Sequence, residues 1–263
     1  LGKYSMNQVG KKFEALIEIV TKLRSPGGCP WDIEQTSKSL IPYFIEEVYE
    51  AIEAIDNKDW DAVKEELGDV MLHLIFQSLI AKENKDFDLE SSIDHVSKKL
   101  IDRHPHVFGN EKADGAFHAK QNWEAAKHKE KKRSSRINGV PKTLPSIIQS
   151  QRIQQKASYA GFDWKNSNDV WKKINEEIEE LKIAENNGSK QEIENELGDL
   201  IFSVINLARF LDVSAENALR LTNKKFKRRF MFIENELEKT GKKFEDSSLA
   251  ELDLIWNQAK DQG

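Results

Sequence analysis

The sequence has little of what marks secreted, membrane-spanning or nucleic-acid-binding proteins. Its 263 residues include one cysteine, Cys29, so an intramolecular disulfide is excluded and a reducing compartment is favoured. The longest apolar run, residues 70–81, is interrupted by polar residues and is too short to span a bilayer. The N-terminal segment lacks a basic region followed by a long apolar core, so we expect no signal peptide. From these features we expect a cytoplasmic protein without a membrane partner, and the net charge of -5 gives no indication of a nucleic-acid partner.

Glycine and proline are also scarce, and their scarcity favours helices. The chain has 13 glycines and 6 prolines against a charged fraction of 32%, which suits helices with Glu- and Lys-rich outer faces. Apolar residues recur at spacings of three and four almost throughout, and we find no convincing strand of period two. We therefore predict an all-α fold. The predicted helices cover residues 13–25, 40–56, 60–85, 89–103, 144–159, 168–185, 190–211, 215–239 and 249–258.

A charged stretch near the middle of the chain predicts a boundary between two domains. Residues 127–136 read KHKEKKRSSR, and Gly139, Pro141 and Pro145 follow as helix breakers. We interpret the Lys/Arg run as a solvated helix end and linker rather than as a nucleic-acid patch. The predicted domains are an N-terminal module at 1–130, a linker at 131–145 and a C-terminal module at 146–263.

The most informative pattern is an internal repeat. A block of EExxE followed by ELGD occurs twice, and the two copies are displaced by 130 residues. An apolar run follows each ELGD, and a short aromatic tetrapeptide, CPWD or GFDW, precedes each block. This self-similarity predicts a duplicated module. The copies read EEVYE at 46–50 with ELGD at 66–69, and EEIEE at 176–180 with ELGD at 196–199.

The spacing of the acidic residues predicts a metal site in each repeat. Residues three apart share a helix face, so Glu47 and Glu50 project together, as do Glu66 and Asp69. A short turn between the two helices would make them antiparallel, with the carboxylate pairs facing. Four converging carboxylates repel one another, and they are tolerated only when they are exposed or neutralised by a cation. The apolar run after Asp69 predicts a buried helix, which argues against exposure.

The residue types in and beside these acidic motifs indicate which metal ion the site would bind. A glycine stands at the same place in both repeats, Gly68 and Gly198, and predicts close backbone packing beside the carboxylates. Oxygen ligands without His or Cys favour Mg²⁺ or Mn²⁺. A di-iron bundle would carry Glu-x-x-His pairs instead of Glu-x-x-Asp. A single Glu pair would indicate only a solvated helix surface, but two quartets at identical spacing favour metal binding.

At these residues the chain resembles the MazG family of nucleoside triphosphate pyrophosphohydrolases, in its two-module form. The family motif is EExxE, a gap and then ExxD, and the resemblance extends to RHPHVF at 103–108 and NKKFKRRF at 223–230. It covers nearly the whole chain and implies a tandem repeat of a four-helix-bundle-like MazG module. It also implies hydrolysis of an NTP or dNTP to the monophosphate and pyrophosphate, dependence on Mg²⁺ (with Mn²⁺ as an alternative), and a homodimer whose helices complete one another's bundles.

The resemblance further implies roles for individual residues. In this family a Lys and an Arg four apart on the next helix contact the triphosphate. They match Lys225 and Arg229 in the second module, where their charges would act in catalysis, and Lys99 and Arg103 in the first. The second and third Glu of EExxE bind the metal together with the Glu and Asp of ExxD. The implied metal ligands are Glu47, Glu50, Glu66 and Asp69, and Glu177, Glu180, Glu196 and Asp199.

Two tryptophans are weaker candidates for substrate binding. Trp31 and Trp164 stand just before their modules, where each could stack on a base, with core or interface packing as the alternative. Both modules keep the quartet and a Lys/Arg pair. We expect the second module to be the main hydrolase because its basic helix, NKKFKRRF, carries more cations.

Three functional hypotheses follow from these features. The first is a pyrophosphohydrolase of broad base preference, and the second is a pyrophosphatase restricted to dUTP or dCTP. The third is a non-catalytic helical interaction protein, whose acidic faces bind a partner and whose quartets are remnants. A substrate panel separates the first two. Loss of a metal-dependent activity on mutation of Glu196 and Asp199 would exclude the third.

Overall fold

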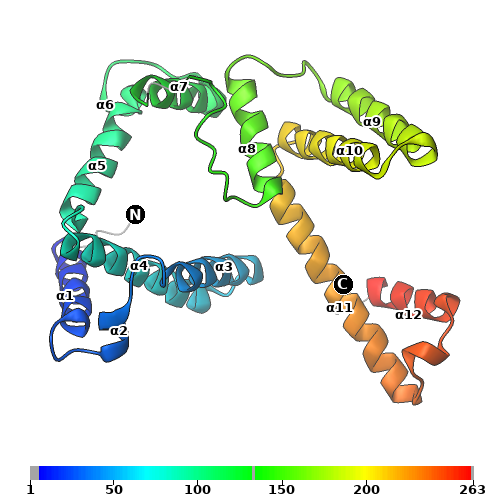
Figure 1. Cartoon of the computed structure of the whole chain (residues 1–263), viewed down its shortest axis with the longest axis horizontal. Helices are drawn as coiled ribbons and strands as arrows, with labels where there is room; N and C mark the ends of the chain where they lie inside the picture. The colour runs from blue at the N-terminus through cyan, green and yellow to red at the C-terminus, as the bar shows by residue number, and fades with distance from the viewer. Residues whose placement is uncertain (1–5, 132–133, 262–263) are drawn as a thin grey trace. The chain divides into compact units, whose positions relative to one another are not determined.

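The structure, a computed structural model, describes residues 6–131 and 134–261, and we find only helices in these ranges (Figure 1). The predicted all-α fold is confirmed. The chain forms two compact units, residues 1–112 and residues 113–263. Positions 132–133 of the predicted linker, and the first five residues of the N-terminal segment, lie outside the described residues. No helix in the described ranges is long and apolar enough to cross a membrane.

The first unit is built around a helical hairpin. Its helices are α1 (Met6–Arg24), α2 (Pro30–Glu34), α3 (Ile41–Asn57), α4 (Trp60–Glu83), α5 (Leu89–Asp102) and α6 (Pro105–Phe108). Lys58 ends α3 in the left-handed conformation, with a φ of 58°, and turns the chain back on itself. The carboxylate of Asp59 then caps α4 by accepting the N–H of Ala62 at 3.1 Å. This short turn places α3 and α4 side by side and antiparallel, as the acidic spacing predicts.

A hydrophobic core anchors the first unit at one end of this hairpin. Val20 of α1, Leu40 before α3 and Ile75 of α4 are almost fully buried, and Phe76 and Ile80 extend the cluster. Each such side chain stabilises the fold by about 1.5–3 kcal/mol relative to an exposed one. The core involves the second half of α4. The first half, which carries ELGD, therefore packs chiefly on α3.

The second unit repeats the hairpin with different neighbours. Its elements are α7 (Gly115–Glu130), α8 (Ser146–Tyr159), α9 (Ser167–Asn187), α10 (Lys190–Phe210), α11 (Ala215–Thr240), η1 (Phe244–Asp246) and α12 (Leu249–Asp261). Ser189 and Glu192 form a reciprocal capping box that starts α10 directly after α9. Val170 and Ile174 of α9 pack on Leu207 of α10 in the local core.

Three α-helices were not expected from the sequence, and one of them lies next to the point where the two compact units divide. These are α2, α6 and α7, and α7 has few large apolar residues and no side-chain cap at its N-terminus. A buried ion pair of 2.6 Å between Lys156 of α8 and Glu124 holds α7 within the second unit. The division between the units therefore falls at 112/113, before α7, whereas the sequence assigned α7 to a module ending at residue 130.

The sequence predicts that the helix after each ELGD is buried on nearly every face, but in the structure only one side of it is buried. On α4, His73, Ile75, Phe76 and Ile80 are buried. The other side of α4, and the same side of α10, carry apolar residues at i, i+4 and i+7 that remain 41–51% exposed. We call these two rows the apolar stripes. They consist of Leu67, Met71 and Leu74 on α4, and of Leu197, Ile201 and Val204 on α10.

The two repeated glycines also differ from expectation. A Cβ added at Gly68 or Gly198 would meet no atom within 4 Å among the described residues. The expected close backbone packing is therefore not made by the helices of this chain, because both glycines lie on the open side of their hairpins, next to the apolar stripes.

Candidate metal centres

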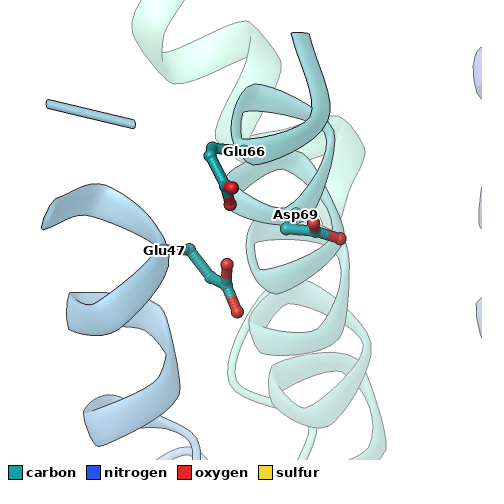
Figure 2. Close-up of side chains that lie close together, drawn as sticks. All are labelled: Glu47, Glu66 and Asp69. Carbon is teal, nitrogen blue, oxygen red and sulfur yellow. The ribbon is translucent and has the colours of Figure 1, made fainter. Parts of the chain in front are cut away.

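The first hairpin brings three of its four predicted ligands together. Glu47 of α3 faces Glu66 and Asp69 of α4, and one carboxylate oxygen of each lies within 4.8 Å of the others (Figure 2). All three side chains are half-buried. The fourth predicted ligand, Glu50, lies outside this group, although it is close enough to act on the charges of the other three. We call this group the first cluster.

The charges of the first cluster are uncompensated. Burial, followed by the negative charges of Asp69, Glu50 and Glu66, raises the pKa of Glu47. Partial desolvation and the charges of Glu50 and Glu65 raise the pKa of Glu66, while a hydrogen bond with Glu47 lowers it. Among the described residues, no basic side chain forms an ion pair with Glu47, Glu66 or Asp69. A divalent cation would supply the missing positive charge, and an all-carboxylate donor set suits such a hard cation.

The second hairpin forms an equivalent group, which we call the second cluster. Carboxylate oxygens of Glu177, Glu196 and Asp199 lie within 4.8 Å of one another. Glu177 is buried, Glu196 is half-buried and Asp199 is exposed. Glu180 lies outside the group, but desolvation and the charges of Glu177 and Glu196 raise its pKa. The two repeats therefore converge in the same way, with the middle Glu of EExxE and both acids of ExxD at the centre.

One residue of the second cluster was missed by the sequence analysis. The ammonium of Lys173 lies 2.7 Å from the carboxylates of both Glu176 and Glu177. These two contacts raise the pKa of Lys173, and its charge partly offsets the rise in the pKa of Glu180. The available signal was a Lys placed three and four residues before the two Glu residues on one helix. The corresponding position of the first hairpin is Tyr43, which brings no charge.

The basic residues of the second module lie on α11, and one of them, Arg229, contacts α12. Lys225 is exposed, and the guanidinium of Arg229 lies 5.5 Å from the ring centroid of Trp256. The Nε atom of Arg229 is buried without a hydrogen-bond partner. Phe226 packs on the same indole, with centroids 5.1 Å apart. Within the described chain no ion pair joins Lys225 or Arg229 to the second cluster. Trp256 was not predicted as a site residue, since a Trp in a short terminal helix carries no signal of its own.

The remaining candidates occupy different environments. Lys99 is half-buried on α5, and Arg103, which caps that helix, is only 3% exposed. Trp31 is half-exposed and meets Tyr43 edge to face, with centroids 5.8 Å apart. Tyr43 itself lies one helical turn before Glu47. Trp164 is exposed in the loop after α8.

These features define a class of protein: an all-helical chain with two antiparallel hairpins, each presenting a cluster of carboxylates suited to a divalent cation. The chain belongs to the MazG nucleotide pyrophosphohydrolase family, because the profile of the MazG nucleotide pyrophosphohydrolase domain matches residues 35–108 and 166–231. Both matches include a complete hairpin with its cluster. The duplicated module predicted from the repeat is thereby confirmed.

Similar proteins match nearly the whole chain. The nucleoside triphosphate pyrophosphohydrolase/pyrophosphatase MazG of Thermotoga maritima is 47% identical over 257 residues, covering 97% of this chain and 98% of its own length. The nucleoside triphosphate pyrophosphohydrolase of Escherichia coli K12 is 36% identical over 263 residues, 98% of each chain. A Bacillus subtilis protein of unknown role, YabN, is 40% identical over 253 residues, which make up 95% of this chain and 52% of YabN.

Proposed function

We propose that this protein hydrolyses nucleoside triphosphates and deoxynucleoside triphosphates of several bases to the monophosphate and pyrophosphate, with a divalent cation as cofactor. The observation that carries the proposal is the convergence of three carboxylates within 4.8 Å in each hairpin. It stands together with near-full-length similarity to proteins named for this activity. Nucleoside triphosphates are cytoplasmic metabolites, and we expect the enzyme to act in the cytoplasm.

The cofactor that best suits the clusters is Mg²⁺, with Mn²⁺ as an alternative. Glu47, Glu66 and Asp69 would hold the ion in the first hairpin, and Glu177, Glu196 and Asp199 in the second. Glu50 and Glu180, each one turn beyond the central Glu, would complete the two ligand sets. The bound ion would offset the charge of the triphosphate and lower the pKa of the attacking water.

The second module is proposed as the main hydrolytic site. Water would attack the α-phosphorus, and the bond to the oxygen bridging the α- and β-phosphates would break, releasing pyrophosphate. Lys225 and Arg229 would bind the phosphates and offset the charge that develops on them. The contact of Arg229 with the ring of Trp256 would help to position the guanidinium, and the unpartnered Nε leaves a donor for an anionic ligand. Lys99, Arg103, Trp31 and Trp164 stay candidates for substrate binding.

A homodimer is proposed from the open side of each hairpin. The apolar stripes of α4 and α10 lie at equivalent positions in the two repeats, although their residues are 41–51% exposed in the single chain. Ile41, Ile45 and Val48 add a similar exposed row on α3. Helices of a second copy would cover these rows, complete each hairpin as a four-helix bundle, and pack closely at Gly68 and Gly198.

The test is a substrate panel of common NTPs and dNTPs with Mg²⁺, Mn²⁺ or EDTA, with the products separated by chromatography. Monophosphate and pyrophosphate formed only with metal would support the proposal, and turnover confined to dUTP or dCTP would support the restricted pyrophosphatase. Diphosphate and phosphate would contradict the assigned bond. Absence of any turnover would favour the non-catalytic interaction protein.

A variant pair makes this test specific. Asp199→Asn should lose the activity, whereas Glu194→Gln on the same helix should keep it, because Glu194 is exposed and lies outside the second cluster.

A further inference from the structure

A histidine lies directly behind the first cluster and has no counterpart in the second. His73 follows Asp69 by one turn of α4 and is only 7% exposed. Its ring packs against Phe44 of α3, with centroids 5.8 Å apart. Phe44 precedes Glu47 by one turn of α3. Because the two helices are antiparallel, His73 and Phe44 form the layer of the hairpin next to the carboxylates.

The imidazole of His73 is incompletely satisfied. Its Nδ1 atom is buried and has no hydrogen-bond partner in the described structure. Buried polar atoms without a partner are rare in native proteins, and each indicates strain, a functional role, or a missing water or ion. The negative charge of Asp69 acts on the imidazole, although His73, like Glu50, lies outside the group of ligand atoms within 4.8 Å of one another.

The spacing of Asp69 and His73 suits a shared metal ion. Side chains four residues apart on one helix face can hold a single cation, as the two histidines of the H-E-x-x-H motif do for zinc. Neutral imidazole is also the commonest side-chain ligand of transition metals.

We propose that His73 supplies a nitrogen ligand to the metal ion of the first cluster, beside Glu47, Glu66 and Asp69. This inference rests on the proposed metal-binding role of that cluster. It also changes the ligand set expected from the sequence, in which only oxygen atoms were counted.

A mixed set of nitrogen and oxygen ligands changes the preferred cation. Carboxylates alone suit both Mg²⁺ and Mn²⁺, while an added imidazole shifts the preference away from Mg²⁺ and towards transition-metal ions. At the matching positions of the second hairpin, Ser203 replaces His73 and Ile174 replaces Phe44. The second cluster therefore keeps oxygen ligands. The first centre should therefore bind transition-metal ions, Mn²⁺ included, more tightly relative to Mg²⁺ than the second centre does.

The test uses full-length protein in which only one centre binds metal. Glu196→Gln with Asp199→Asn removes the second centre, and Mn²⁺ is added to the first. Pulsed electron paramagnetic resonance should then detect ¹⁴N coupling to Mn²⁺, and the coupling should vanish in His73→Gln. Calorimetric titration should show the Kd for Mn²⁺ rising by about tenfold or more in His73→Gln, with little change for Mg²⁺.

Two controls separate ligation from packing. Phe44→Leu disturbs the same layer but keeps the imidazole, so its ¹⁴N coupling should persist. Protein carrying Glu66→Gln with Asp69→Asn binds metal only at the second centre and should show no ¹⁴N coupling. Thermal unfolding of each variant in EDTA checks that it is folded.

The outcomes distinguish the inference from the function on which it rests. Mn²⁺ bound at the first centre without ¹⁴N coupling, or equal losses of Mn²⁺ and Mg²⁺ affinity in His73→Gln, would overturn the role of His73 alone. Failure of the first centre to bind either ion would overturn the metal-binding role of the whole first cluster.

Discussion

Lys173 and Glu177 lie one turn apart on α9, with 2.7 Å between ammonium and carboxylate. Glu177 is the most buried acid of the second cluster, and the ammonium of Lys173 forms an ion pair with it. Tyr43 occupies the corresponding place on α3, so the first cluster has no such partner. The two centres therefore differ in net charge, and also in the residue one turn after the Asp of ELGD, which is His73 in the first and Ser203 in the second.

Replacement of Lys173 should destabilise the metal-free protein. Lys173→Met leaves the buried carboxylate of Glu177 unpaired, and the free energy of unfolding in EDTA should fall by roughly 1 kcal/mol. Because the ion pairs raise the pKa of Lys173, its contribution is fully present at neutral pH and is lost only in alkaline solution. Urea unfolding measures the change, and added Mg²⁺ should reduce it. Lys172→Gln, which breaks only an exposed pair with Asp169, should have almost no effect.

Loss of any carboxylate of the second centre should abolish most turnover without unfolding the chain. Glu177→Ala, Glu180→Ala, Glu196→Ala and Asp199→Ala should each lower kcat/KM by about 100-fold or more, because each removes a proposed metal ligand. Steady-state kinetics at saturating Mg²⁺ and circular dichroism would be measured together. A variant that unfolds would indicate a structural role for that residue instead.

The first cluster should make metal-free stability depend on pH. A raised pKa means that the folded protein holds its proton more tightly than the unfolded chain. The contribution of Glu47 therefore favours folding at low pH and is lost as pH rises through its folded pKa. In EDTA the wild type should lose stability relative to Glu47→Gln as pH rises from about 4 to about 7. Added Mg²⁺ should reverse this ranking at neutral pH. Thermal unfolding checks both, and parallel pH profiles would contradict the account.

The guanidinium of Arg229 should be needed for turnover. Arg229→Gln should lower kcat/KM by about 100-fold, the scale seen when one donor to a developing negative charge is removed. Arg228→Gln removes a neighbouring exposed cation and should cost far less. Kinetics of both variants under one set of conditions give the comparison, and equal losses would indicate a general effect of positive charge.

Charge placed on an apolar stripe should weaken self-association. Met71→Glu puts a carboxylate into the proposed dimer contact, where its desolvation would be costly. Sedimentation velocity should show the wild type as a dimer and Met71→Glu as largely monomeric. Lys64→Gln, at an exposed position of the same helix, should remain dimeric. A monomeric wild type would rule out the homodimer.

The sequence was informative where short-range spacing decides structure. The hairpins and the convergence of Glu47 with Asp69 follow from helical periodicity and a short turn, and both are seen. Contacts made between distant segments carried no such signal. The pair of Lys156 with Glu124 joins α7 to α8, and the contact of Arg229 with Trp256 joins helices separated by a long turn.

Exposure was the least predictable property. Apolar residues on every face of α4 indicate burial, but they do not tell whether the covering atoms belong to the same chain. The apolar stripes show that in this protein one face is covered by α3 and the core, while the other stays open.

All the clustered carboxylates of one centre lie within a single uninterrupted hairpin, from α3 to α4 or from α9 to α10. Copying one short stretch of gene therefore copies a whole centre, with its ligands already in register across a tight turn. Substitutions beside one centre, such as His73 in the first or Lys173 in the second, could then arise without affecting the other centre. A protein with two centres of separate chemistry can arise in this way from one duplication and a few point substitutions.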